Sequence, residues 1–494
     1  MVVKPWVVQK FGGTSVGKFP RQIADDIVKQ YSGEYKVVVV CSARSTDTKE
    51  EGTTTRLLKA ASECLEKNDY KEAVEAVRRD HVSEAEAQIG DEAIREQLVK
   101  DIHGECDTVE RFLEAAQVID EVSPRTMDSI MSAGERLSCL FMAALMNDRG
   151  LRAQCVDLSR VIPMGHDVGR GGLDQDFYTF LTERITDAVC AAGDCIPVVT
   201  GFFGTVPGGL LGGVGRGYTD LCAALCAVGV GADELQIWKE VDGIFTADPR
   251  KVPTARLIGQ ITPEEAAELT YYGSEVIHPF TMEQVIRARI PIRIKNVLTP
   301  GGAGTVIFPD DNSRPGEQTP LHPPERLPPA SAAAPKLPTA VTIKKDVLVL
   351  NVHSNKKNHS HGFMARVFGT LDRWQLSVDL ISTSEVHVSM ALHSSLPESA
   401  LRDALAELRQ HGSVDVTRKM CIVSLVGKQM KHLVGIAGRM FTTLAEAQVN
   451  IEMISQGASE INISCVIEER DALKALNVLH QRLLCQVQQP PLMS

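Results

Sequence analysis

The strongest constraint on the fold is an alternation, through the first three hundred residues, of short Val- and Ile-rich runs with amphipathic stretches. The runs that we interpret as buried strands are WVVQKF, YKVVVVCSA, CIPVVTGFFG, DELQIWKEVDG and IPIRIKNV. Strands that are apolar along their whole length are typical of a parallel sheet with helices on both faces. The sequence therefore predicts an α/β domain with a largely parallel sheet over residues 1–307, with its chemistry in loops at the strand ends.

The composition changes abruptly after Ile307. Residues 308–345 are rich in Pro, Ala and Ser with almost no aliphatic periodicity, which predicts a linker. Beyond it, residues 346–415 and 416–494 share one pattern: a strand, a Gly-containing turn, a helix and further strands. This internal repeat predicts two copies of one structural unit.

Charge and composition exclude some classes of function. A formal net charge of -11 over 494 residues argues against nucleic acid as a partner, since phosphate backbones recruit concentrated Lys and Arg. No apolar run reaches the roughly 18 residues of a membrane span, so we expect no membrane partner and no export. The twelve cysteines are scattered without metal-binding spacing, so reduced thiols, a cytoplasmic location and no metal site built from them are expected.

The octet KFGGTSVG lies between a predicted strand and a predicted helix. Glycines let the backbone turn tightly against a phosphate, the helix N-terminus offers free N–H groups, and a lysine neutralises phosphate charge. The alternative is a plain strand-to-helix turn, but the flanking Lys and Thr-Ser favour a phosphate site. The candidates for binding ATP phosphates are Lys10, Gly12, Gly13, Thr14 and Ser15.

This octet resembles the N-terminal signature of the aspartate kinase family, and four further blocks resemble that family in the same order. They are MSAGERLS (131–138), GRGYTD (215–220), EVDGIFTADPR (240–250) and YGSEVIHP (272–279). Three positions depart from the bacterial pattern: Tyr218 replaces glycine, Glu275 replaces lysine, and Lys239-Glu240 replaces Thr-Asp. Together with the Pro-rich linker, these departures resemble the fungal branch of the family.

The resemblance implies ATP-dependent phosphorylation of the side-chain carboxylate of L-aspartate to 4-phospho-L-aspartate, with Mg²⁺, as the first step toward threonine, methionine and isoleucine. Aspartate carries two carboxylates and an ammonium, so its site needs an arginine and a carboxylate. Glu135 and Arg216 match the family positions for these roles. A helix-capping Glu and a surface Arg are the structural alternatives. Further substrate-binding candidates are Thr54, Thr55 and Thr219.

Two residues are predicted to be catalytic. Phosphoryl transfer consists mostly of positioning and charge neutralisation, so Lys10 is expected to supply a cation at the transferred group. Asp220 is expected to hold Lys10 and to assist with magnesium. The alternative role of Asp220 is that of a helix N-cap together with Thr219.

Four more candidates are assigned to ATP from the family resemblance: Lys239, Glu240, Phe245 and Arg250. The segments DG and DPR that accompany them are also common turn sequences, so hairpin and turn residues are the alternative. His278, which precedes a proline, is interpreted as structural.

The two C-terminal repeats resemble ACT domains, which are ferredoxin-like βαββαβ modules that bind amino acids between paired copies. Feedback inhibition by an amino acid follows from this resemblance, with threonine favoured and lysine as the alternative. The modules are also expected to form a homo-oligomer, and pure dimerisation is the competing role. In the family the two modules are commonly intertwined, in contrast to a sequential arrangement. The effector-binding candidates are Gly362, Phe363, Met364, Ala365, Asp379, Ser384, Asn450, Ile451 and Gln456.

Asp379 carries the main chemical argument for this effector site, because an Asp suits an ammonium. A solvated loop residue is the alternative.

Two other functions compete with this interpretation. A sister amino-acid kinase would share the first domain, but SAGERLS, GRGYTD and the tandem repeats disfavour it. An amino-acid-sensing regulator with an inactive kinase fold would have no need of intact Lys10, Glu135, Arg216 and Asp220.

Overall fold

The computed structural model describes residues 4–45, 52–66, 68–163, 174–204, 206, 209–210, 217–271, 277, 279–308, 337–354, 362–393, 398–457 and 461–485. The chain divides into two compact units. The first spans Met1–Ile244, Gly259–Ile261 and Ile277–Asp310, and the second spans Phe245–Ile258, Thr262–Val276 and Asp311–Ser494. The two units interleave along the chain, whereas the sequence predicted a single boundary at residue 307.

Within the described part of the first unit, eight strands form one sheet in the order β3-β4-β2-β1-β5-β7-β8-β6. All neighbouring strands are parallel except β7 and β8. The strands are β1 (Trp6–Phe11), β2 (Lys36–Cys41), β3 (Ala153–Val156), β4 (Ile196–Thr200), β5 (Glu234–Lys239), β6 (Gln260–Ile261), β7 (Ile292–Asn296) and β8 (Thr305–Ile307). The mostly parallel sheet is confirmed.

Helices cover both faces of this sheet. One face carries α9 (Tyr218–Val230), flanked by α7 (Gln175–Cys190) and α11 (Pro279–Arg287). The other face carries α6 (Pro124–Asp148), with α3 (Thr53–Leu65), α4 (Lys71–Gln88) and α5 (Glu92–Ile119) packed around it. The remaining turns of helix in this unit are α1 (Gly13–Lys18), η1 (Gln22–Val28) and α2 (Lys29–Ser32). This is the predicted three-layer arrangement.

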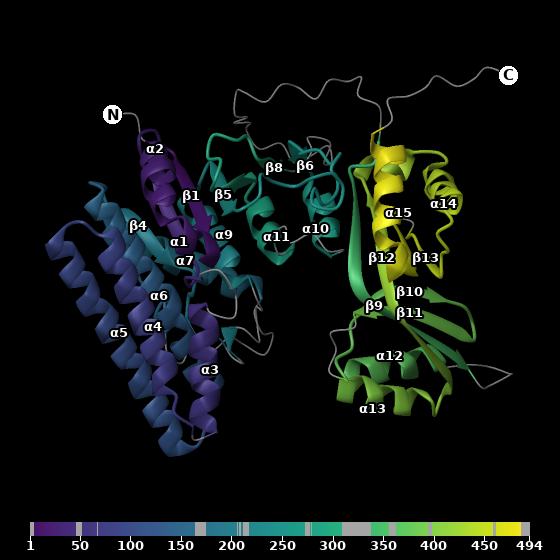
Figure 1. The fold of residues 1–494 in the computed structure, drawn as a ribbon, viewed down its shortest axis with the longest axis horizontal. Helices are drawn as coiled ribbons and strands as arrows, with labels where there is room; N and C mark the ends of the chain where they lie inside the picture. The colour runs from purple at the N-terminus through teal and green to yellow at the C-terminus, as the bar shows by residue number, and fades with distance from the viewer. Residues whose placement is uncertain are drawn as a thin grey trace. The chain divides into compact units, whose positions relative to one another are not determined.

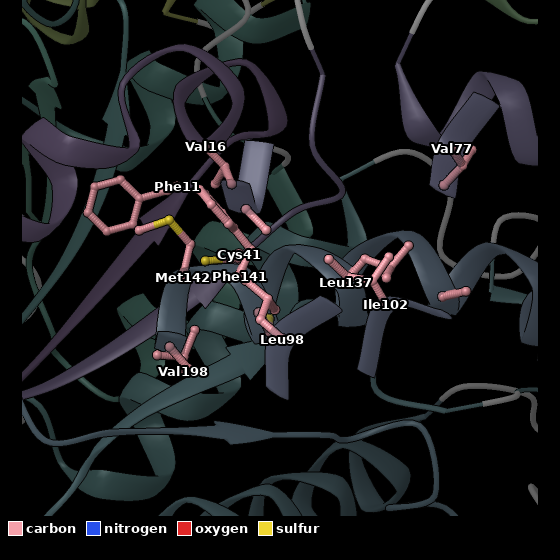
Figure 2. Packing of buried hydrophobic residues seen from close by; sticks show 14 of the residues in the cluster. Phe11, Val16, Cys41, Val77, Leu98, Ile102, Leu137, Phe141, Met142 and Val198 are labelled. Atoms are coloured by element: carbon pink, nitrogen blue, oxygen red, sulfur yellow. The ribbon is translucent and has the colours of Figure 1, made fainter. Parts of the chain in front are cut away.

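The core between the sheet and α6 explains why the apolar runs form central strands. Figure 2 shows Phe11 and Cys41 of neighbouring strands beside Phe141 and Met142 of α6, and all four are buried. Phe11 also stacks on Trp238 of β5, with ring centroids 6.0 Å apart. Burial of such side chains contributes roughly 1.5–3 kcal/mol each.

The second unit contains an antiparallel sheet of six described strands in the order β10-β11-β9-β12-β14-β13. Its strands are β9 (Ala340–Ser354), β10 (Val378–Thr383), β11 (His387–His393), β12 (Gly412–Val426), β13 (Met453–Ser455) and β14 (Asn462–Glu468). Its helices are α10 (Pro263–Tyr271), α12 (Phe363–Arg373), α13 (Glu398–Leu408), η3 (Lys428–His432), α14 (Ile436–Glu446), η4 (Glu469–Asp471), α15 (Ala472–Leu479) and η5 (His480–Leu484). The predicted pair of ferredoxin-like modules is confirmed as the fold of this region.

Strands β9 and β12 are shared between the two modules (Figure 1). The first half of β9 pairs with the second half of β12, and the remaining halves pair with each other across a register shift. Each strand contains a non-glycine residue with positive φ near the register shift: Asp346 (56°) in β9 and Lys419 (60°) in β12. Because β9 starts at Ala340, the end of the predicted linker 308–345 is strand, and the 346–417 module is inserted into the other.

Two segments that precede the linker in sequence pack against the C-terminal elements of the second unit. Thr246 Oγ1 lies 2.9 Å from Nε2 of the buried His480. Glu265 on α10 accepts hydrogen bonds from Thr339 Oγ1 (2.6 Å) and from the backbone N–H of Lys428 (2.8 Å). A compact unit is therefore assembled from distant parts of the chain.

Candidate active site

An ion pair at the carboxyl end of strand β1 forms the centre of the candidate site. Lys10 is the penultimate residue of β1, between β2 and β5, and Asp220 lies in the first turn of α9. The Lys10 Nζ atom is 2.7 Å from Asp220 Oδ1, and the two side chains are only 13% and 14% exposed. The expected contact between these two residues is thus present. It fixes an ammonium group at the carboxyl end of a central strand.

The glycine pair turns the chain from β1 into α1. A Cβ atom on Gly13 would overlap the carbonyl oxygen of Ala43, and the backbone N–H of Ser45 donates to the Gly13 carbonyl at 3.0 Å. On Gly12, a Cβ would meet only Lys10 Nζ, at 4.0 Å. One side of the turn is therefore packed against the loop after β2, whereas the other side faces the ammonium group. The residues present here fit a phosphate group.

Ser15 and Glu240 join the glycine turn to the end of strand β5. Ser15 Oγ donates to Glu240 Oε1 at 2.6 Å, and Lys239 is the last residue of β5. Thr14 is half-buried in α1. Because β1 and β5 are parallel neighbours, the carboxyl ends of both strands meet at this edge. Two groups of residues that the sequence assigned to ATP thus lie together.

Glu135 of α6 lies buried beside the start of α9. It is 1% exposed, and its Oε1 accepts a hydrogen bond from Thr219 Oγ1 at 2.9 Å. Burial raises the pKa of the Glu135 carboxyl to about 7. Its second oxygen, Oε2, has no hydrogen-bond partner among the described residues. A buried carboxylate with an unused acceptor suits an ammonium ligand.

Gly201 lies close to the Thr219 side chain, and Tyr218 lies next to Glu135. A Cβ on Gly201, which follows β4, would overlap the Thr219 side chain. Tyr218 packs edge-on against Phe202, with ring centroids 6.4 Å apart. Burial, together with the charge of Glu135, raises the pKa of Tyr218 well above its usual range. The residue that replaces the family's glycine is therefore buried next to the Glu135 carboxyl.

The threonines before α3 differ in their surroundings. Thr54 is half-buried and Thr55 is exposed in the first turn of the helix. Thr53, which the sequence analysis did not select, is buried and its Oγ1 lies 3.1 Å from His81 Nε2. Burial first, and then the positive charges of Arg44 and Arg56, lower the pKa of His81 to about 3.

Arg44 connects the loop after β2 to α4 and α6, and it too was not predicted from the sequence. Its guanidinium is 5% exposed and binds Asp80 Oδ2 (2.5 Å) and Glu84 Oε2 (2.6 Å) of α4. Its backbone N–H donates to Ser138 Oγ of α6, and its carbonyl accepts from the N–H of Thr53. The i, i+4 spacing of Asp80 and Glu84 was the one signal that two carboxylates share a helix face.

Four residues that were singled out from the sequence are not placed at this site. Arg216 and Glu275 lie outside the described residues, as does most of the predicted linker. Phe245 and Arg250 belong to the second unit, where Arg250 Nε pairs with Asp248 Oδ1 at 3.0 Å. Their assignment to ATP stays a prediction.

Comparison with known proteins decides the family. The Amino acid kinase family matches residues 5–296, and the ACT domain family matches residues 423–483. Aspartokinases from Candida albicans and Saccharomyces cerevisiae are each 60% identical, over 97% of this chain and 90% and 93% of the relatives, respectively. This chain belongs to the aspartokinase family. It is an aspartate kinase of the fungal type, as the sequence motifs predicted.

Solved aspartokinase structures agree with this assignment. Escherichia coli aspartokinase III in complex with aspartate and ADP has a TM-score of 0.73 and 29% identity, covering 96% of this chain and 99% of that one. The same enzyme with lysine and aspartate has a TM-score of 0.74 and 28% identity, covering 97% and 99%. The aspartokinase fold therefore extends over both units.

The effector candidates of this aspartokinase lie in two groups within the second unit. Gly362 caps α12 in a left-handed conformation (φ 76°), followed by buried Phe363, half-buried Met364 and exposed Ala365. Asp379 lies on β10, and the backbone N–H of Ser384 donates to His387 in the turn that follows.

The second group surrounds β13, and β10 contacts β13. Leu380 and Met453 from these two strands share one small apolar cluster. Half-buried Ile451 precedes β13, exposed Gln456 follows it, and Asn450 Nδ2 donates to Glu452 Oε1 at 2.8 Å. The fold thus brings together β10 and β13, the two strands near which the effector candidates lie.

The described helices include none that is both long enough and apolar enough to cross a bilayer.

Proposed function

We propose that this aspartokinase transfers the γ-phosphoryl group of ATP to the side-chain carboxylate of L-aspartate, giving 4-phospho-L-aspartate and ADP. The observation that carries the proposal is the Lys10–Asp220 ion pair at the sheet edge. Catalysis of phosphoryl transfer depends on positioning and on neutralising charge in the moving group. Lys10 provides that charge, and Asp220 holds its ammonium in place.

The aspartate substrate is recognised through its charged groups. Glu135 Oε2 accepts from the substrate ammonium, and Arg216 binds a carboxylate in a bidentate way. Thr219 orients Glu135 through their hydrogen bond. Thr54 and Thr55 are the remaining substrate contacts at the start of α3. This arrangement selects an amino acid with a second carboxylate.

The nucleotide lies along the glycine turn and the end of β5. Gly12, Gly13 and Thr14 offer backbone N–H groups to the phosphates, and the Ser15–Glu240 hydrogen bond closes the turn against β5. Lys239, Phe245 and Arg250 complete the proposed nucleotide contacts. Mg²⁺ would be held mainly by the phosphates with help from Asp220, and when bound it would neutralise phosphate charge.

Regulation is assigned to the second unit. We propose feedback inhibition by an amino acid bound near Asp379, with threonine favoured because fungal relatives feed threonine, methionine and isoleucine synthesis. The remaining assignments are Gly362 to Ala365, Ser384, Asn450, Ile451 and Gln456 as effector contacts, a homo-oligomer through the ACT modules, and a cytoplasmic location. A linker within 308–345 is proposed to join the two parts.

The test is ADP release by the purified full chain with ATP and Mg²⁺ and with L-aspartate, L-glutamate or no acceptor. Turnover that depends on aspartate and that threonine suppresses supports both parts of the proposal. Turnover with glutamate alone would indicate a sister amino-acid kinase. Amino-acid binding without turnover would indicate a regulator that lacks kinase activity.

A further inference from the structure

Asp379 of the proposed effector site is already paired with a cation from this chain. Lys344 Nζ lies 2.6 Å from Asp379 Oδ1, and the two side chains are 18% and 12% exposed. The other carboxylate oxygen, Asp379 Oδ2, is buried and has no hydrogen-bond partner in the described part of the chain. One oxygen is thus taken by a fixed ammonium group, and one remains for a ligand.

The ion pair joins the two modules. Lys344 lies in the first half of β9, opposite Ile422 in the second half of β12, and therefore belongs to the sheet of the 420–485 module. Asp379 lies on β10 of the inserted module, at the irregularity between Val378 and Leu380 in the pairing of β10 with β11. A ligand that binds Asp379 therefore meets groups from both modules.

Among the described residues, the second repeat has no equivalent pair. The matching position in VNIEMIS, compared with LSVDLIS in the first repeat, is Glu452. Glu452 is exposed, and its Oε1 accepts from the neutral Asn450 side chain at 2.8 Å. A largely buried carboxylate with a built-in counter-charge is thus confined to the first repeat among the described residues.

We propose that Lys344 determines effector specificity by excluding amino acids with a cationic side chain, so that the site accepts a neutral amino acid such as threonine and rejects lysine. This inference rests on the proposed effector site at Asp379, and it names the residue that selects the ligand there. Lys344 positions Asp379 and supplies the repulsion.

The charges around Asp379 explain why a cationic side chain is excluded. Of the residues proposed to bind the effector, Asp379 is the only carboxylate, and Lys344 already neutralises it. The α-ammonium of an amino acid can share Asp379 through Oδ2, and its α-carboxylate offsets that charge. A lysine ligand adds an ε-ammonium near a fixed cation, and repulsion between like charges is strong where water is partly excluded.

The experiment is titration calorimetry of the full chain with threonine and with lysine, for wild type and for K344M. The wild type is expected to bind threonine at least tenfold more tightly than lysine. In K344M that preference is expected to fall at least tenfold, because the fixed cation is gone and Asp379 is free to accept a second ammonium. K344Q retains a hydrogen-bond donor to Asp379 without the charge, and it is expected to behave like K344M.

Two variants separate charge from structure. K344R retains the cation and is expected to keep the preference within threefold of wild type. Lys345 is the exposed neighbour, so K345M should change neither binding nor basal turnover. Thermal denaturation of each variant identifies any that fails to fold, and the K344Q result then decides.

The two levels of the proposal fail differently. If wild type binds threonine in preference to lysine but both K344M and K344Q keep that preference, Lys344 does not select the ligand and the inference is overturned. If wild type binds lysine more tightly, the inference is also overturned, although effector binding stands. If wild type binds neither amino acid, the proposed feedback itself fails and the inference fails with it.

Discussion

Lys10 and Asp220 lie 2.7 Å apart although 209 residues separate them in sequence. The pair forms because β1 ends and α9 begins at the same edge of the sheet. A largely buried ammonium held by a single carboxylate has a fixed position, and a fixed charge stabilises a transition state without reorganisation.

Replacing Lys10 tests this role directly. K10M is expected to lower kcat at least 10²–10³-fold, since a preorganised donor to the transferred group typically contributes that much. The KM for aspartate should change less than threefold, because Lys10 does not bind that substrate. The measurement is steady-state ADP release, with K29M as a control at an exposed lysine of the same domain. Equal losses in both variants would contradict a specific role for Lys10.

Asp220 acts on the same reaction through Lys10. D220N keeps the shape of the side chain but removes the charge, so Lys10 loses its anchor. We expect kcat to fall about 10–10²-fold, less than for K10M, and the double variant K10M/D220N to be no slower than K10M alone. An additive loss in the double variant, measured in the same assay, would indicate that the two residues work independently.

The raised pKa of Glu135 predicts a pH dependence of substrate binding. Burial raises this pKa to about 7, so a substantial fraction of the free enzyme carries a neutral Glu135 below that pH. Because the substrate ammonium needs the ionised form, the KM for aspartate should fall as pH rises from 6 to 8. E135Q should raise KM roughly 10–10²-fold, as expected for loss of a hydrogen bond to a charged group, and should show no such pH trend.

The same shift predicts a change in stability. A folded-state pKa above the ordinary value of 4.5 means that the folded chain binds more protons than the unfolded chain between about pH 4.5 and 7. This contribution to stability is present below pH 4.5 and is lost as pH rises through 7. Urea denaturation of wild type and E135Q at pH 5.5 and 8 should show a larger loss for wild type, and parallel curves would argue that Glu135 is not buried as described.

Much of the catalytic fold could be predicted because its signals are local. Continuous apolar runs such as WVVQKF indicate strands buried on both faces, and the turn of Gly12 and Gly13 next to Lys10 is visible in eight consecutive residues. These features depend on short-range pattern. The contact between Lys10 and Asp220 is long-range, and it was expected only because the two motifs that contain these residues resemble the family.

The features that were missed depend on which distant elements pack together. No local pattern states that Arg44 meets Asp80 and Glu84, or that Thr53 meets His81, because both contacts require α4 to lie over the loop after β2. The two sequence repeats likewise do not reveal that β9 and β12 are shared between the modules. The first half of each strand belongs to one module and the second half belongs to the other.

The buried His81, which contacts Thr53 at the start of α3, predicts that the folded chain loses stability in acid. Its pKa in the folded chain is about 3, below the value near 6.5 expected when unfolded, so the unfolded chain takes up a proton first as pH falls. Stability is therefore lost as pH falls from about 6.5 toward 3, by up to about 1.4 kcal/mol per pH unit from this group. H81Q retains a polar group facing Thr53, and its stability should decline less between pH 7 and 5 in urea denaturation.

Gly13 offers the sharpest test of the packing around the phosphate turn. A methyl group there would overlap the Ala43 carbonyl, which is backbone and cannot rotate away. G13A is therefore expected to destabilise the chain by about 1–3 kcal/mol and to reduce kcat, because the turn must move away from Lys10.

The matched control is G104A. Gly104 lies exposed within α5, where an added Cβ meets nothing within 4 Å. Because alanine has a higher helix propensity than glycine, G104A should stabilise the chain by about 0.5–1 kcal/mol and leave kcat unchanged. Urea midpoints that shift in opposite directions for the two variants would establish that overlap with the Ala43 carbonyl excludes a side chain at position 13, and that the loss of a glycine as such does not destabilise the chain. A G13A enzyme as stable and as active as wild type would instead require the loop after β2 to be free to move.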